Sequence, residues 1–165
     1  MDWLIYILVF IIITCVLLIW FINTYNHFQN YIIRINEAET NIDSILRKRF
    51  DLLNKSIGII KANINVDNDI MEVIVKLRSR KLTNFELDRI LYEAINEFHQ
   101  YSENYEELKN SESFIKIDIG LNESEPEIVA SRKYYNDIIT DYNKLVRTFP
   151  SNIIAKTFKY KIKPY

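Results

Sequence analysis

An uninterrupted apolar segment near the N-terminus constrains this chain most. Residues 3–22 include no charged residue, proline or glycine, and Trp3 and Trp20 lie near the two ends of a run that closes at Ile22. At about 1.5 Å per residue, a helix of this length spans about 30 Å, the thickness of a bilayer's hydrocarbon core. A cleaved signal peptide would need a basic start, a shorter apolar run and a small-residue cleavage site. We therefore predict an uncleaved transmembrane helix at 3–22, after a short flank at 1–2.

The positive charges around this segment predict its orientation. Before it, only the α-amino group is positive, and Asp2 offsets that charge. After it, the first positive side chain is Arg34, and three more follow at 47–49. Because basic flanks stay on the cytoplasmic side, we expect a cytoplasmic C-terminal part and an external N-terminus in the cell membrane.

Composition narrows the function of the remainder, residues 23–165. All 21 Lys and Arg residues follow the apolar segment, as do all 22 acidic residues except Asp2, so the remainder is electrically balanced. This balance argues against a uniformly basic surface for nucleic acid. Cys15 is the only cysteine and lies in the apolar segment, and His27 and His99 are far apart, which disfavours disulfides and zinc sites. We expect no metal, cofactor or catalytic site.

Apolar residues recur in steps of three and four from residue 25 to residue 64, which predicts one long amphipathic helix continuous with the transmembrane helix. A shorter helix is expected at about 70–81, after turn residues at 65–68. Thr83 and Glu86 have the spacing of a capping box that opens the next helix, which carries apolar residues as far as 108.

The second half of the chain predicts another long helix. Ser124 and Glu127 form a second capping box, with Pro126 in the first turn, after a less regular stretch at 110–125. The helix that they open should end near Phe149, before a proline. The fold class is therefore all-α: an N-terminal transmembrane helix followed by an antiparallel four-helix bundle with a long first helix.

Three segments resemble blocks of the LemA family of bacterial membrane proteins. Residues 131–158 read SRKYYNDIITDYNKLVRTFPSNIIAKTF and resemble the family's C-terminal signature, while 41–53 and 104–114 resemble two upstream blocks. The resemblance implies a membrane-anchored bundle at 23–165 with no established enzymatic activity. The chain departs from the family pattern where Tyr105 is followed by Glu106 in place of proline, which should let the third helix run on.

The matching residues that we single out as structural positions or a partner face are Asp43, Arg49, Asp51, Arg132, Tyr135, Asn136, Asp137, Asp141, Tyr142, Asn143, Arg147, Pro150, Ser151 and Asn152. The i,i+4 spacing of Asp43, Arg47 and Asp51 favours ion pairs on a helix surface. The alternative is that these charges meet a partner, or meet Arg132, Asp137 and Asp141 on the last helix.

Aromatic and amide residues of the last long helix have helical spacing. Tyr135 and Tyr142 are interpreted as core residues. Asn136 and Asn143, seven residues apart, are interpreted as setting the register of the bundle, with a partner-binding stripe as the alternative.

The terminal motif is interpreted as a structural stop. Pro150 should end the helix, and Ser151 or Asn152 should cap a short segment that folds back over the end of the bundle and covers Phe149. The Lys-rich tail should stay free.

Two functions follow from these patterns. The favoured one is a non-enzymatic interaction or scaffold protein of the bacterial cell envelope, with a protein partner or self-association. The alternative is a protein active at the membrane surface, whose long amphipathic helix and basic tail engage anionic lipid.

Overall fold

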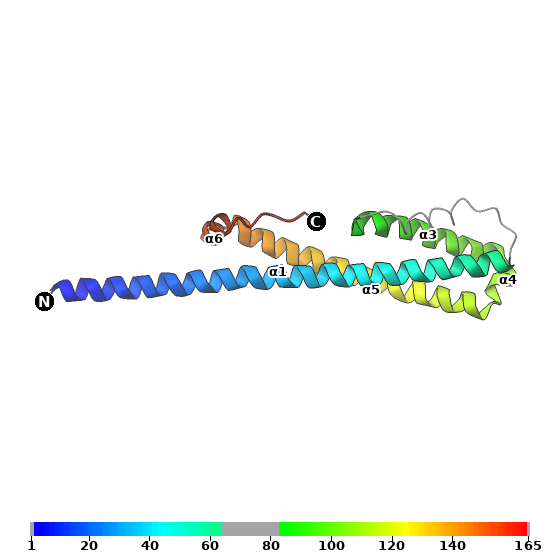
Figure 1. Cartoon of the computed structure of the whole chain (residues 1–165), viewed down its shortest axis with the longest axis horizontal. Helices are drawn as coiled ribbons and strands as arrows, with labels where there is room; N and C mark the ends of the chain where they lie inside the picture. Colours follow the sequence, from blue (N-terminus) through cyan, green and yellow to red (C-terminus); the bar gives the residue numbers. More distant parts are fainter. Residues whose placement is uncertain (1, 64–82, 165) are drawn as a thin grey trace. The chain divides into compact units, whose positions relative to one another are not determined.

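The computed structural model describes residues 2–63 and 83–164, and within them the chain is helical and has no strand. The helices are α1 (Asp2–Asn63), α3 (Asn84–Asn104), α4 (Glu106–Lys109), α5 (Glu112–Arg147) and α6 (Ser151–Thr157) (Figure 1). The all-α fold class and the long first helix are confirmed. The short helix predicted at 70–81 and the turn before it lie outside the described residues.

The chain forms two compact units, and α1 and α5 contribute to both. The terminal unit consists of Met1–Ala38 and Tyr134–Tyr165, and the central unit consists of Glu39–Lys133. We describe each unit by itself.

The N-terminal part of α1 leaves its apolar side chains uncovered in the terminal unit. Every side chain from residue 3 to residue 19 is exposed. Within the described residues, α1 is the one helix long and apolar enough to cross a membrane, and none of its most apolar window is buried. A core helix of a water-soluble fold would cover such a window by packing.

The core of the terminal unit joins α1 to α5 and α6. Its buried members are Phe28, Ile35, Ala38, Ile138, Ile139, Tyr142, Ile154 and Ala155. The Phe28 ring meets the Tyr142 ring edge to face at a centroid distance of 6.1 Å, and Arg34 Nε lies 3.4 Å from the hydroxyl of Tyr134. Since residue numbers rise along α1 as they fall along α5, the two helices are antiparallel here. Tyr142 is 3% exposed, which confirms its predicted place in the core, and burial raises the pKa of its hydroxyl.

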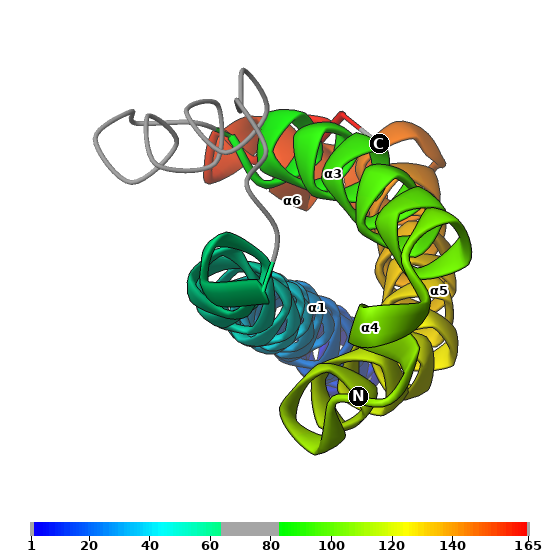
Figure 2. The same cartoon turned by 90° about the vertical axis from the view of Figure 1, so that its right-hand side faces the viewer.

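The central unit has its own core, to which α1, α3 and α5 contribute apolar side chains. The chain passes from α3 through the short α4 into α5 (Figure 2). The rings of Phe98 on α3 and Phe114 on α5 stack at a centroid distance of 4.4 Å. Leu52 of α1 packs against α5 at Gly120, where a Cβ atom would lie 3.1 Å from Leu52 Cδ1. Glycine therefore lets the two helices approach closely at this point.

The capping box at Thr83 is confirmed, whereas the continuous third helix is wrong. The backbone N–H of Thr83 donates to Glu86 Oε2 at 3.0 Å, and the N–H of Glu86 donates to the Thr83 hydroxyl at 3.3 Å. Tyr105 has an extended backbone (φ −126°, ψ 104°), so the chain leaves α3 and begins the short α4. Leu108 of α4 is completely buried, and this burial offsets the cost of interrupting the helix.

The second capping box is also wrong, because α5 begins at Glu112 and continues through Pro126. Ser124 is buried, and its hydroxyl donates to the carbonyl of Leu121 at 2.6 Å instead of capping a helix start. Proline leaves the carbonyl of Asn122 without its helical N–H donor, but Asn122 is exposed and water can reach it. Packing of the apolar face of α5 before and after Pro126 outweighs the cost of about 3 kcal/mol that a proline has inside a helix.

The terminal stop is confirmed, but its capping arrangement differs from the prediction. α5 ends at Arg147, and α6 folds back to bury Ile154 and Ala155. The Ser151 hydroxyl donates to the carbonyl of Leu145 at 2.6 Å, so this side chain caps the end of α5 and not the start of α6. The reason is the burial of Ser151 against the last turn of α5, where carbonyls lack helical partners.

The predictions for Phe149 and the tail are wrong. Phe149 is 80% exposed, so α6 does not cover it. The tail is fastened to the unit: the Tyr160 ring stacks on the Phe28 ring at 4.7 Å, and Gln29 Nε2 donates to the Tyr160 hydroxyl at 2.7 Å. Aromatic stacking on α1 outweighs the entropy of a free chain end.

The core position of Tyr142 generates a stability prediction. Tyr142→Ala should lower the free energy of unfolding by about 3–5 kcal/mol, because it leaves a cavity beside Phe28. Tyr142→Phe keeps the ring and should cost much less. Denaturant unfolding of the full chain in mild detergent measures both. Equal stability of Tyr142→Ala and the unmodified chain would contradict the assignment.

Candidate functional site

The predicted site residues divide between the two units. Asp43, Arg49, Asp51 and Arg132 belong to the central unit, and the remaining ten belong to the terminal unit. Arg49, Tyr142, Asn143 and Ser151 are buried. Asp51, Asn136, Asp137, Asp141, Arg147 and Pro150 are exposed, and the other four are intermediate.

The most constrained charged group is Arg49, on the face of α1 that packs in the central unit. It is 2% exposed, and its Nη2 donates to Glu125 Oε2 on α5 at 2.7 Å. Its Nε is buried without a hydrogen-bond partner among the described residues. A buried arginine must be paired to offset lost hydration, so Glu125 is essential to this arrangement.

Arg132 extends this group of charges to α3. It forms an ion pair with Asp88, whose side chain is mostly covered. Burial lowers the pKa of Arg132, and the positive charge of Arg49 lowers it further. The two carboxylates therefore hold two neighbouring guanidinium groups inside one unit, and this arrangement ties α1, α5 and α3 together.

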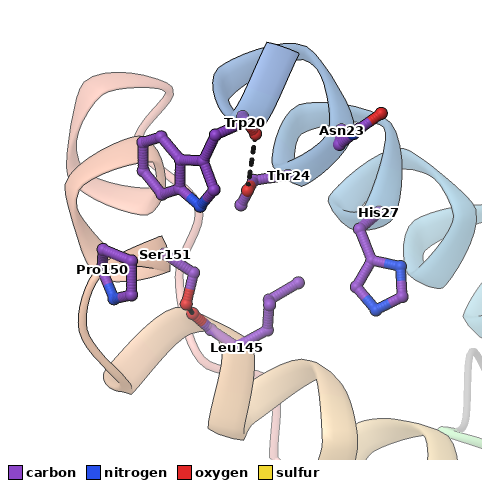
Figure 3. A pocket seen from close by; sticks show the side chains of 7 residues that line it. All are labelled: Trp20, Asn23, Thr24, His27, Leu145, Pro150 and Ser151. Atoms are coloured by element: carbon purple, nitrogen blue, oxygen red, sulfur yellow. Dashed lines mark hydrogen bonds between the residues drawn. The ribbon is translucent and has the colours of Figure 1, made fainter. Parts of the chain in front are cut away.

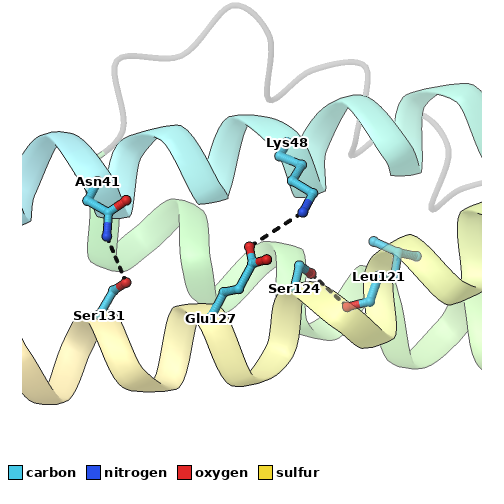
Figure 4. A network of polar contacts seen from close by, with 6 residues as sticks. All are labelled: Asn41, Lys48, Leu121, Ser124, Glu127 and Ser131. Carbon is cyan, nitrogen blue, oxygen red and sulfur yellow. Dashed lines mark hydrogen bonds and ion pairs between the residues drawn. The ribbon is translucent and has the colours of Figure 1, made fainter.

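Two further polar contacts join α1 and α5 in the central unit (Figure 4). Asn41 Nδ2 donates to the Ser131 hydroxyl at 3.1 Å, and Lys48 Nζ lies 3.4 Å from Glu127 Oε2. These pairs run in antiparallel order along the two helices. No sequence pattern indicates Glu125 or Asp88 as partners, and the local pattern at Ser124 predicts a capping role for Glu127. Only the continuation of α5 through Pro126 would have placed both glutamates beside α1.

The predicted surface pairs on α1 are partly present. Arg47 Nε lies 2.7 Å from Asp43 Oδ2, which confirms the first i,i+4 pair. Asp51 has no ion-pair partner among the described residues, so the second pair does not form. On the last helix, Asp141 pairs with Lys144 at 3.1 Å. Exposed pairs of this kind contribute at most about 1 kcal/mol each.

Asn143 has a different role from the one predicted. Its Nδ2 donates to the Lys163 carbonyl at 2.8 Å, and its Oδ1 accepts from the Lys163 N–H at 2.9 Å. Asn136 is exposed. The interpretation of both asparagines as register-setting residues between helices is therefore wrong. The reason is that the returning tail satisfies the Asn143 amide.

An open pocket of about 350 Å³ lies in the terminal unit, between α1 and the α5–α6 turn (Figure 3). Trp20, Thr24 and His27 line one side, and Leu145, Pro150 and Ser151 line the other. The hydroxyls of Thr24 and Ser151 already donate to backbone carbonyls. The lining therefore offers aromatic and apolar surface more than reactive groups.

The remaining titratable groups give little sign of chemistry. Burial raises the pKa of Glu97, and the neighbouring Glu93 raises it further. His99 Nε2 lies 3.2 Å from Asp118 Oδ1 in the central unit. Within residues 2–63 and 83–164, no group of three or more His, Cys, Asp or Glu side chains has the arrangement of a metal site.

The unequal burial of Arg49 and Glu125 generates a prediction. Glu125→Ala should lower the free energy of unfolding by about 1–3 kcal/mol, because it leaves a buried guanidinium unpaired beside Arg132. Arg49→Met should cost less, because the half-exposed Glu125 can be hydrated and Met fills much of the vacated volume. Denaturant unfolding of both variants measures the difference. The opposite order would refute a mainly structural role for this pair.

Comparison with known proteins places the chain among relatives. Residues 38–165 match the model of the LemA family. Protein LemA of Metamycoplasma hominis is 29% identical over 143 residues, which is 79% of this chain. The chain spans 60% of the length of that relative. Because this match covers well over half of the chain, the chain belongs to the LemA family.

Proposed function

We propose that this protein is a single-pass membrane protein whose helical bundle serves as a non-enzymatic interaction or scaffold module at the bacterial cell envelope. The exposed apolar side chains of residues 3–19 support the membrane part of this proposal. Such a surface gains free energy when lipid covers it. The family relationship agrees with a membrane anchor but assigns no reaction.

One observation carries the interaction role. The family-like residues of α5 divide into two groups by burial, although they lie within one helix. Tyr142 and Asn143 are buried and hold α1 and the tail. Asn136, Asp137, Asp141 and Arg147 are exposed and share one face of the helix, which we call the α5 outer face.

The side chains of the α5 outer face make few polar contacts with the rest of the described structure. Among the described residues, the side chains of Asn136 and Asp137 make no hydrogen bond, and Asp141 makes only an exposed pair with Lys144. Stability therefore does not require these residue types at these positions. A protein partner that recognises amide, carboxylate and guanidinium groups would require these residue types.

The charged groups of the central unit support a structural rather than a catalytic role. Arg49, Glu125, Arg132 and Asp88 neutralise one another. A general acid or base would need a group free to exchange a proton with a substrate. The basic tail, which the membrane-surface alternative uses together with the long amphipathic helix, is fastened to the terminal unit through Tyr160 and Lys163 and is not a free chain end.

The proposed orientation predicts a labelling pattern. A cysteine at the exposed Ser113, in a Cys15→Ala background, should resist a membrane-impermeant maleimide in intact cells, because the bundle is cytoplasmic. Permeabilised cells should be labelled and serve as the control. Labelling without permeabilisation would reverse the orientation.

The interaction role predicts a position-specific crosslink. A photoreactive amino acid at Asn136 should give a discrete adduct in living cells, whereas one at Asn30, exposed on α1 of the same unit, should not. Asp137→Lys should reduce the yield of the adduct by opposing the partner's charge. An adduct at twice the chain's 19.8 kDa would identify self-association. Equal yields at Asn136 and Asn30, or none at either, would refute the α5 outer face as a partner site.

A further inference from the structure

A second surface of the terminal unit exposes apolar side chains that the interaction role does not use. Phe149 is 80% exposed and Ile153 is 51% exposed, with Pro150 exposed between them. They lie at the start of α6, opposite Ile154 and Ala155, which are buried in the core. We call Phe149, Pro150 and Ile153 the α6 apolar edge. Its exposure costs free energy in water.

Contacts within the terminal unit fix the level of α6 along α1. The Phe158 ring, just after α6, lies 4.9 Å from the Tyr25 ring and 6.1 Å from the Phe21 ring, centroid to centroid. At the other end of α6, Pro150 lines the same pocket as Trp20 (Figure 3). The whole of α6 therefore lies beside residues 20–25.

Residues 20–25 are where the apolar segment of α1 ends. If 3–22 cross the hydrocarbon core, Trp20 and Tyr25 lie in the headgroup layer, which amphipathic rings prefer. An element packed at the same level must lie in or against that layer. The exposed apolar edge would then be covered by lipid, as it is in helices that lie along a membrane interface.

The charges around α6 match such a surface. Lys156, Lys159 and Lys161 are exposed, and no acidic residue occurs after Asp141. Lysines near an anionic leaflet gain about 1 kcal/mol each. Their long stems also let the ammonium groups reach phosphates while the apolar edge inserts.

We infer that α6 is a membrane-surface foot: the α6 apolar edge inserts into the headgroup region of the bilayer that α1 crosses, and the surrounding lysines contact anionic headgroups. This inference depends on the membrane span in the proposed function. The foot would hold the terminal unit against the leaflet, so that this unit would not move freely at the end of the membrane span. The α5 outer face would then be presented at a defined height above the lipid.

Fluorescence quenching in vesicles tests the foot. The full chain is reconstituted in vesicles of phosphatidylcholine and phosphatidylglycerol, with an environment-sensitive fluorophore on a single cysteine. The positions are Phe149→Cys and Ile153→Cys in a Cys15→Ala background, with Asn136→Cys as the matched exposed control in the same unit. Since Phe149 and Ile153 are exposed, neither substitution opens the core. Lipids with a nitroxide near the headgroup should quench both foot positions several-fold more than the control, and aqueous iodide should show the reverse order.

The native Cys15 separates failure of the foot from failure of the span. A fluorophore on Cys15 should be quenched by lipids with a nitroxide deep in the acyl chains, since Cys15 lies within the apolar segment. If Cys15 is quenched in this way but the foot positions behave like Asn136, the span stands and the foot is refuted. Foot positions shielded from both iodide and lipid would show that protein covers the edge, which also refutes it. An unquenched Cys15 refutes the span and the foot together.

Discussion

The antiparallel packing of α1 against α5 is the constraint on which both units depend. In the terminal unit, Phe28 meets Tyr142 in a buried core. In the central unit, Leu52 packs close to Gly120, and Arg49 pairs with Glu125. An amphipathic helix becomes stable chiefly by burying its apolar stripe against another element. In both units, α5 covers part of the apolar stripe of α1.

The buried ion pairs of the central unit show how charged side chains can hold helices together without taking part in a reaction. Two guanidinium groups lie close enough for Arg49 to lower the pKa of Arg132, and one carboxylate faces each of them. Replacing such a network by apolar residues is often neutral, whereas breaking it is costly. Its two ion pairs join α5 to α1 and to α3 at fixed positions along the helices. This is the property that a rigid scaffold for a partner face would need.

The end of α5 shows how one small motif organises three neighbours. Ser151 caps the last turn of α5, Ile154 and Ala155 close the core, and Asn143 holds the backbone of the returning tail. The result brings α6 beside the end of the apolar segment of α1. The terminal unit therefore combines a short helix beside the end of the apolar segment with an exposed face on α5. The two proposals therefore draw on different surfaces of the same unit.

The sequence by itself determined the local features of this protein. The length of its apolar run, the helical steps along α1, the Thr83 capping box and the stop after Arg147 all depend on residues a few positions apart. The burial of Tyr142 also followed from helical spacing. Tertiary structure decided the rest. Ser124 and Ser151 sit in good capping sequences but bond carbonyls of α5, because burial against neighbouring turns outweighs a local cap. Arg49 and Asn143 acquired their partners from segments 76 and 20 residues away, a choice that no local pattern encodes.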